Sequence, residues 1–182
     1  AIDEVILVIR DDARTWFDKL ALSLNPRKPF TFTAGGEERQ DSVANGLNAV
    51  SEKSQWVAIH DGARPCVGSQ AITDTLAKAR ETGAAVTAAP VTDTLKMSDS
   101  ADRIARNVDR SNLWAVQTPQ IFACDIFKRA LETVRSQGTS VTDDTAACEL
   151  IGQPVALVTN STANPKVTTP ADLPLIEHLL KG

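Results

Sequence analysis

Apolar and polar positions follow one another along the chain as short apolar runs, polar turns and longer amphipathic stretches. Val5–Ile9 is apolar on both faces, as expected for a strand that helices cover on both sides of a parallel sheet. Residues 56–59, 84–89 and 154–159 are further short runs that indicate strands, each followed by polar residues. This recurrence of strand, polar turn and helix predicts an α/β fold with a doubly wound, mostly parallel sheet.

Amphipathic spacing predicts the helices that lie between these strands, over residues 11–24, 69–82 and 124–136. Thr142 or Asp143 is expected to cap another helix, and Pro170 to open the last one. In that last helix Leu173, Ile176 and Leu180 are expected to face inward. Polar residues 98–106 suggest an excursion from the sheet.

The turn His60-Asp61-Gly62-Ala63-Arg64-Pro65 carries the candidate chemistry, because it directly follows the apolar run 56–59. Ligands of open α/β sheets bind outside the carboxyl ends of the strands. Asp61 can bind a hard cation there and Arg64 a phosphate. Gly62 is expected to allow an unusual backbone conformation and to let a ligand approach closely. A plain Asp-Gly turn is the alternative. His60 is interpreted as a buried, hydrogen-bonded strand residue rather than a base.

Other polar groups also follow predicted strands, namely Gly35-Gly36, Thr92–Thr94 and Asn164–Lys166. If the strands are parallel, these groups share one rim with Asp61. Ser42 either caps the following helix or contacts a ligand. Four basic residues are candidates to hold phosphates: Arg39, Arg64, Arg110 and Lys166.

Composition narrows the function. The chain has 182 residues with a formal charge of −4, which favours a single domain and argues against a nucleic-acid coat. Its three cysteines form no Cys-x-x-Cys pair, which suits a reducing compartment and argues against structural zinc. No nucleophile elbow is present. Phosphoryl or nucleotidyl transfer needs mainly positioning, positive charge and Mg²⁺, and Asp61 would hold that ion.

Seven segments of the sequence resemble the 2-C-methyl-D-erythritol 4-phosphate cytidylyltransferases, in the family's order: residues 35–43, 60–65, 89–96, 109–114, 117–120, 142–144 and 164–168. The resemblance implies a Rossmann-like nucleotidyltransferase fold. It also implies a reaction of CTP with methylerythritol phosphate that releases pyrophosphate, in cytoplasmic isoprenoid biosynthesis.

The resemblance assigns expected roles to single residues. The nucleotide would contact Gly36, Glu37, Arg39, Ser42 and Gly62, although the family commonly has Asp at position 37 and Ala at position 62. Asp61 would bind Mg²⁺ and act in catalysis with Arg64 and Lys166. The polyol phosphate would contact Arg64, Thr94, Arg110, Thr118, Thr142 and Lys166.

An arm of about residues 95–112 is implied to embrace a second subunit, so that Thr94 and Arg110 complete the neighbour's active site in a homodimer. The family's opening strand and glycine-rich loop are not found in this sequence. We therefore expect residues 1–182 to be a single nucleotidyltransferase domain without that strand and loop, and a poor catalyst by itself.

Three alternatives remain open. A related cytidylyltransferase that uses ribitol 5-phosphate shares most of these motifs. A non-catalytic nucleotide-binding or dimerising module would fit the absent loop. A dehydrogenase is disfavoured because the dinucleotide fingerprint Gly-x-Gly-x-x-Gly is absent.

Overall fold

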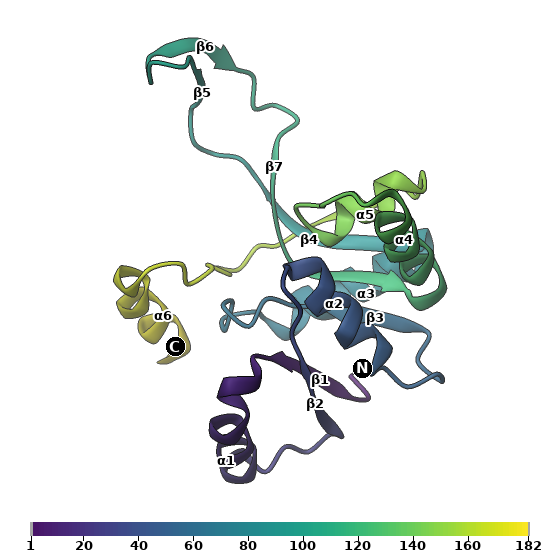
Figure 1. Ribbon diagram of the computed structural model, residues 1–182. Helices are drawn as coiled ribbons and strands as arrows, with labels where there is room; N and C mark the ends of the chain where they lie inside the picture. The colour runs from purple at the N-terminus through teal and green to yellow at the C-terminus, as the bar shows by residue number, and fades with distance from the viewer. Residues whose placement is uncertain (1, 182) are drawn as a thin grey trace.

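The computed structural model describes residues 2–181 (Figure 1). Its strands are β1 (Val5–Ile9), β2 (Phe30–Ala34), β3 (Trp56–Ile59), β4 (Ala84–Pro90), β5 (Leu95–Ser98), β6 (Ile104–Val108), β7 (Trp114–Ala123) and β8 (Ala156–Thr159). Its α-helices are α1 (Arg14–Leu24), α2 (Arg39–Asn48), α3 (Ser69–Thr82), α4 (Cys124–Gln137), α5 (Asp144–Leu150) and α6 (Leu173–Lys181). Short 3₁₀ turns precede α1 and α6.

The central sheet has four strands in the order β3-β7-β4-β8. β7 runs antiparallel to both of its neighbours, and β8 runs parallel to β4. Three strands therefore share one direction, and the expected mostly parallel α/β sheet is confirmed. β1 and β2 form a separate parallel pair, which α2 contacts while it also packs against α4.

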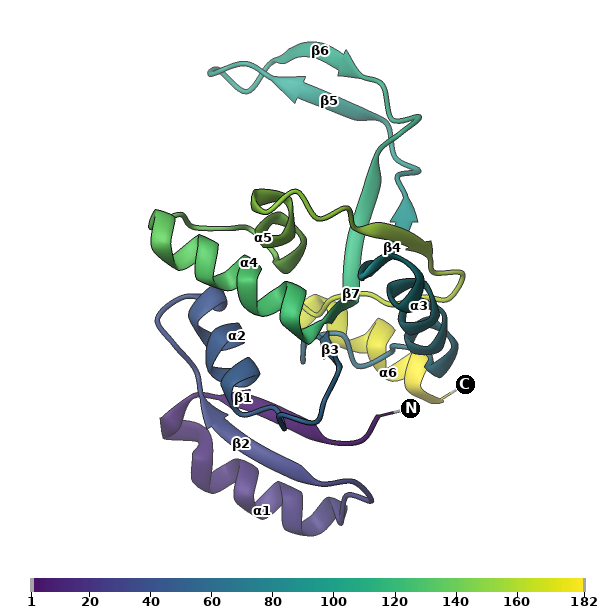
Figure 2. The ribbon, with the colours of Figure 1, turned by 90° about the vertical axis from the view of Figure 1, so that its right-hand side faces the viewer.

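Helices cover both faces of the central sheet, as the apolar strands predicted. Figure 2 shows α2, α4 and α5 on one side of β7 and α3 on the other. On the first side Phe122 stacks on Phe127 of α4 with ring centroids 4.6 Å apart. On the second side Ile121 packs against Ala79 of α3. Neighbouring residues of β7 therefore pack into the cores on opposite faces of the sheet, because side chains alternate along a strand.

The hairpin of β5 and β6 protrudes far from the sheet (Figure 1). The two strands are antiparallel, with Leu95 opposite Val108. Met97 and Ile104 are exposed on this arm, and Ile104 is 71% accessible. Large apolar side chains on a thin hairpin gain little from the chain's own core, so the arm offers apolar surface to another molecule.

The last helix differs from the sequence prediction. Ile176 is buried as expected, but Leu173 and Leu180 are exposed and the prediction of an inward face was wrong for them. The reason is that α6 follows an extended segment and lies apart from α4 and α5 (Figure 1), so only a narrow side of it meets protein. Among residues 2–181 no helix is long and apolar enough to cross a membrane.

Candidate active site

The loop after β3 places one carboxylate among three cations. Asp61 Oδ2 lies 3.2 Å from Lys166 Nζ and 3.4 Å from Arg64 Nε. Asp61 Oδ1 lies 3.8 Å from Arg39 Nη2. These side chains come from three distant parts of the sequence. The structure therefore brings together the three residues predicted to be catalytic and one predicted to bind the nucleotide.

Lys166 reaches Asp61 because the segment after β8 is fastened to the β3 loop. The Val167 N–H donates to the Ala63 carbonyl at 2.8 Å, and Arg64 Nη1 donates to the Asn164 carbonyl at 2.8 Å. Asn164 is itself buried, and its Nδ2 donates to the Thr118 carbonyl of β7 at 2.9 Å. These bonds hold the two loops against the central sheet.

Arg39 is the first residue of α2, whose start is fixed by a capping box between Glu38 and Asp41. Its Nη2 lies 2.6 Å from Asp144 Oδ2 at the start of α5. Asp144 is only 2% exposed, so this ion pair is largely shielded from water on the acidic side. Arg39 thus stands between two carboxylates, Asp144 and Asp61.

The pKa values of this cluster reflect burial and charge together. Burial opposes ionisation of Asp61, but the hydrogen bond and charge of Lys166, with Arg39 and Arg64, hold the pKa of Asp61 below its usual range. Burial likewise opposes the charge of Arg39, but Asp144 and then Asp61 raise the pKa of Arg39. Burial raises the pKa of Asp144, and Arg39 counteracts only part of that effect. Asp61 therefore stays ionised at neutral pH.

Two residues behind the cluster, Thr118 and His60, are hydrogen-bonded to each other and to the Asp61 loop. Thr118 is buried, and its hydroxyl accepts from the Asp61 N–H at 3.1 Å and contacts His60 Nδ1 at 2.9 Å. His60 is exposed, which corrects the interpretation of a buried residue. It lies just beyond the end of β3, and the prediction that it is hydrogen-bonded is confirmed.

The Gly35-Gly36 turn lies at the end of β2. A Cβ atom on Gly36 would come within 2.2 Å of the Asp41 side chain, so only glycine fits there. The Gly36 N–H donates to Ser42 Oγ at 3.0 Å, and the residue that caps α2 is Glu38 rather than Ser42. Glu37 is exposed beside this turn.

The backbone of Gly62 differs from its prediction. Among residues 2–181 the glycines with positive φ are Gly83, Gly138 and Gly152, so Gly62 does not adopt the left-handed conformation. A Cβ atom there would meet nothing within 4 Å. The open space, rather than backbone strain, is what Gly62 contributes to the site.

Other predicted site residues lie apart from Asp61. Thr94 and Arg110 line a shallow hollow at the base of the arm, where Arg110 donates to the Thr92 carbonyl. Within residues 2–181 neither forms a hydrogen bond or ion pair with the Asp61 cluster. Thr142 is exposed just before Asp143, whose side chain caps α5 by accepting from the Ala146 N–H.

Sequence reasoning missed the contact of Asp144 with Arg39, and it placed Asn164 on the rim without predicting that its side chain is buried. Asp144 carried only the signal of an acid at a helix start, and its partner Arg39 is 105 residues away. Asn164 was assigned to a turn, whereas it is a buried anchor for the Lys166 loop. Only the polar character of these positions beside apolar neighbours could have drawn attention to them.

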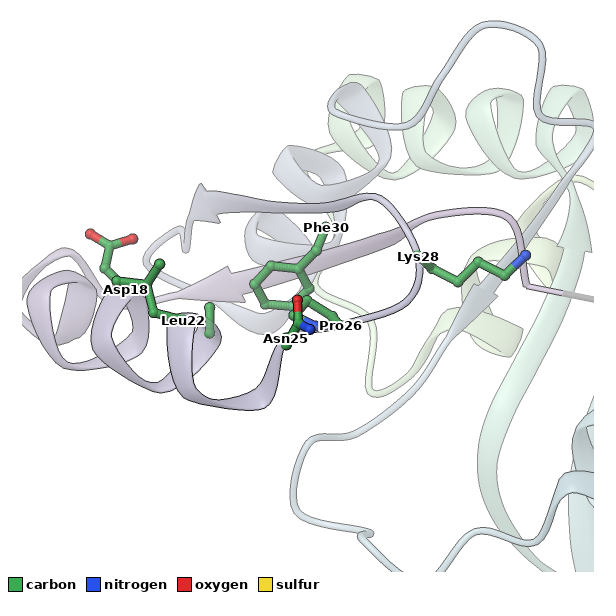
Figure 3. Close-up of a pocket in the computed structure, with 7 residues that line it drawn as sticks. Asp18, Leu22, Asn25, Pro26, Lys28 and Phe30 are labelled. Atoms are coloured by element: carbon green, nitrogen blue, oxygen red, sulfur yellow. The ribbon is translucent and has the colours of Figure 1, made fainter.

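A second hollow lies elsewhere, between α1 and β2. Figure 3 shows Leu22, Asn25, Pro26 and Phe30 gathered there, with Lys28 extending away. It shares no residue with the Asp61 cluster. Its lining is mixed and it contains no group of cations, so it is not the centre of the chemistry.

The cluster suits an anion with a divalent cation. Three cations against two carboxylates leave positive charge to be met by phosphate groups. Among residues 2–181 no group of three or more His, Cys, Asp or Glu side chains could hold a metal by itself. Mg²⁺ commonly takes one or two carboxylates and completes its shell with phosphate oxygens and water, so the single carboxylate of Asp61 fits that ion only together with a phosphorylated substrate.

An α/β sheet with cations and one acid at the carboxyl end of a strand defines an enzyme class that handles phosphorylated substrates, as nucleotidyltransferases do. The family model for IspD, 2-C-methyl-D-erythritol 4-phosphate cytidylyltransferase, matches residues 1–182. The chain belongs to this family, and it is therefore a nucleotidyltransferase in class.

Curated relatives carry the same family name. A protein of Alteromonas mediterranea is 42% identical over 99% of this chain and 75% of its own length. One of Pelotomaculum thermopropionicum is 40% identical over 100% of this chain and 77% of its own length.

Solved structures agree with the fold. The 4-diphosphocytidyl-2C-methyl-D-erythritol synthase of Anaerococcus prevotii has a TM-score of 0.89 at 28% identity, over 100% of this chain and 83% of its own. The 2-C-methyl-D-erythritol 4-phosphate cytidylyltransferase of Thermus thermophilus has a TM-score of 0.79 at 37% identity, over 86% of this chain and 76% of its own. The expected Rossmann-like nucleotidyltransferase fold is confirmed.

Proposed function

We propose that the protein transfers CMP from CTP to 2-C-methyl-D-erythritol 4-phosphate, which yields CDP-methylerythritol and pyrophosphate for isoprenoid synthesis. The observation that carries this proposal is the Asp61 carboxylate within 4 Å of Arg39, Arg64 and Lys166 at the end of β3. Membership of the cytidylyltransferase family indicates which substrates this cluster would act on.

In the reaction a phosphate oxygen of the acceptor attacks the α-phosphorus of CTP, and the bond to the pyrophosphate oxygen breaks. No proton has to be removed from an ionised phosphate, so the site needs no general base. The protein has to bring two anions together and stabilise the charge on the transferring phosphoryl group. Lys166 is about half exposed and is paired with Asp61, whereas Arg64 is held by both Asn164 and Asp61, so Lys166 is the cation more accessible to incoming phosphates.

Asp61 would hold Mg²⁺ with oxygens of the substrates. The ion would neutralise negative charge on the CTP phosphates as they meet the acceptor. Until the phosphates arrive, Lys166, Arg39 and Arg64 screen the carboxylate. We expect metal binding to be weak without CTP and to strengthen with it.

Other residues complete the proposal. Gly36, Glu37, Arg39, Ser42 and Gly62 lie at or near the ends of β2 and β3 and would contact the nucleotide. The polyol phosphate would contact Arg64, Thr94, Arg110, Thr118, Thr142 and Lys166. For Thr118 this contact would need its hydroxyl to leave one present partner, since the side chain is buried and bonded to His60.

The arm supports a homodimer with shared active sites. Thr94 and Arg110 stand at its base, away from the Asp61 cluster of the same chain. In a dimer joined through exposed Met97 and Ile104, they would serve the partner's cluster. We place the reaction in the cytoplasm, because all three cysteines are free and two of them are buried thiols.

The acceptor is tested by pyrophosphate release from CTP and Mg²⁺, with methylerythritol 4-phosphate or ribitol 5-phosphate at equal concentration. We expect turnover with the first acceptor and at least about 100-fold less with the second, since a site that fits one polyol leaves polar groups unpaired with the other. Preference for ribitol 5-phosphate would move the assignment to the sister enzyme, and silence with both would favour a non-catalytic binding module.

A further inference from the structure

His60 stands between β3 and the loop that carries Asp61 and Arg64, and both nitrogens of its ring have partners inside the protein. Its Nε2 lies 3.0 Å from the main-chain oxygen of Arg64. Its Nδ1 lies 2.9 Å from Thr118 Oγ1, which the Asp61 N–H also reaches at 3.1 Å. The imidazole therefore joins the two ends of the loop and ties them to β7.

The chemistry of the partners fixes where the protons lie. A carbonyl oxygen only accepts, so Nε2 of His60 carries a proton and donates it to Arg64. In the neutral ring Nδ1 is then the acceptor, and the Thr118 hydroxyl donates to it while it accepts from the Asp61 N–H. The Arg64 N–H donates to the Asp61 carbonyl at 2.9 Å. Each group donates to the next, and hydrogen bonds aligned in this way strengthen one another.

This ring of bonds fixes the backbone on both sides of the Asp61 carboxylate. The carboxylate has cations on two sides, with Arg39 beyond one oxygen and Arg64 and Lys166 beyond the other. If the loop could shift, the Asp61 carboxylate could move toward one cation and lose contact with the others. Thr118 gives this cycle of hydrogen bonds a rigid support, because Thr118 is buried in β7. A shift of about 1 Å in a catalytic group can lower a rate by about 100-fold.

We propose that His60 is a positioning residue, which acts through Thr118 and the Arg64 carbonyl to hold Asp61 and Arg64 in place for transfer. It takes no proton from a substrate, because Nδ1 accepts from Thr118 and Nε2 donates to Arg64. The kinetic part of this inference rests on the proposed function, whereas the bonding of the imidazole does not.

The kinetic experiment compares His60→Ala, Thr118→Val and the double variant in pyrophosphate release. We expect His60→Ala to lower kcat roughly 10- to 100-fold with little change in the KM for CTP, since it disturbs geometry rather than ground-state binding. The double variant should fall little further than the worse single variant, because both substitutions break one ring of bonds. An unchanged kcat in His60→Ala, or fully additive losses, would overturn the proposal.

Conservative variants of His60 separate its hydrogen bond to the Arg64 carbonyl from its hydrogen bond to the Thr118 hydroxyl. His60→Gln keeps a donor near the position of Nε2, and His60→Asn keeps an acceptor near the position of Nδ1. Each should recover part of the rate that His60→Ala loses. The matched control is His178→Gln, because His178 is exposed on α6 away from the cluster and its loss should leave kcat unchanged. If neither variant recovers any of the rate, the hydrogen bonds of His60 do not position the loop.

The second experiment does not depend on activity. The sequence has only two histidines, so two-bond ¹H–¹⁵N NMR spectra of the ring nitrogens, with His178→Gln to identify His60, report its tautomer directly. We expect the proton on Nε2, which donates to the Arg64 carbonyl, and in Thr118→Val a shift of the Nδ1 signal, because Nδ1 loses the hydroxyl that donates to it. A proton on Nδ1, or an unchanged spectrum in Thr118→Val, would contradict the proposal. If the unmodified protein shows no transfer at all, the proposed function fails and this spectrum still decides the role of His60.

Discussion

At the scale of single residues, Asp61 is one carboxylate whose neighbours decide what it can do. Lys166 and Arg64 lie on one oxygen and Arg39 faces the other. Arg39 is in turn held by Asp144, a nearly buried acid on a different helix. Negative and positive side chains therefore alternate through the site, and Asp144 holds Arg39 in place beside Asp61.

Asp144→Asn tests the contact between Asp144 and Arg39. The amide keeps the volume of the side chain but removes its charge, so the bond to Arg39 weakens and we expect a loss of about 1–3 kcal/mol in the free energy of unfolding. Chemical denaturation measures it. Glu149→Gln is the control, because Glu149 is exposed on the same helix and forms no ion pair within residues 2–181. A loss no larger than that of the control would mean that Asp144 does not anchor Arg39.

Part of the site was predictable from single residues. Asp61, Arg64 and Lys166 each follow a predicted strand, and the rule that ligands gather at strand ends was enough to group them. Asp144 was not predictable in this way, since no local pattern reveals a partner 105 residues away. Gly62 was misread because an Asp-Gly pair suggests a special turn, whereas its backbone is ordinary.

At the scale of elements, α3 is joined to β4 by a polar contact inside an apolar layer. Thr75 and Thr87 are fully buried, and their hydroxyl oxygens lie 2.8 Å apart. The Thr75 hydroxyl also donates to the Ala71 carbonyl at 2.7 Å. The Thr87 hydroxyl must therefore be the donor between the two.

This direction predicts unequal effects of two similar substitutions. Thr87→Val removes a donor and leaves Thr75 bonded to Ala71, so we expect a cost of about 0.5–1.5 kcal/mol in unfolding free energy. Thr75→Val leaves the Thr87 hydroxyl buried without an acceptor, so the cost should be about 1–3 kcal/mol. Urea unfolding of both variants compares them, and a larger loss in Thr87→Val would reverse the assigned donor.

The start of the last helix depends on pH through Asp172. Its carboxylate accepts from the N–H groups of Thr168 and Thr169, both at 2.8 Å, and these bonds lower the pKa of Asp172 to about 2. A folded-state pKa below the unfolded value means that the ionised group stabilises the fold above about pH 4. That contribution is lost as the pH falls toward 2.

The titration is measurable by NMR. The amide signals of Thr168 and Thr169 should shift with a midpoint near pH 2, and hydrogen exchange at these amides should speed up below it. Asp172→Asn should abolish that transition and give fast exchange at all pH values. A midpoint near pH 4 in the unmodified protein would show that the carboxylate does not make these bonds in solution.

Elements were more predictable than their orientations. Strands apolar on both faces predicted a sheet that helices cover on both sides. The helices α3 and α4 end at Gly83 and Gly138, as glycine at a helix end predicts. The face of α6 was misjudged because its apolar spacing indicates amphipathicity without naming the partner surface. Leu173 and Leu180 are exposed because few residues of the described chain lie against them.

At the scale of the whole molecule, the protruding arm divides the predicted substrate contacts into two groups. Arg64 and Lys166 lie with Asp61, while Thr94 and Arg110 lie at the base of the hairpin. A dimer in which each arm serves the other subunit's cluster would reunite these groups.

Mixing two inactive variants tests that arrangement. Asp61→Ala and Arg110→Ala should each be inactive, but in a mixed dimer one of the two sites keeps both residues. With random exchange of subunits the mixture should recover up to about one quarter of the unmodified rate. Pyrophosphate release after joint refolding measures this, with each variant refolded alone as the control. A mixture as inactive as its components would show that the sites are not shared.

In the proposed reaction Asp61 organises the transfer of CMP, and removal of its charge tests that role. Pyrophosphate release from CTP, Mg²⁺ and methylerythritol 4-phosphate is compared between the unmodified protein, Asp61→Asn and the control Asp125→Asn, whose side chain is exposed on α4. We expect Asp61→Asn to lose at least about 100-fold in kcat, because one preorganised charged group can contribute that much, and Asp125→Asn to lose almost nothing. An Asp61→Asn protein that turns over like the control would show that Asp61 does not organise the transfer.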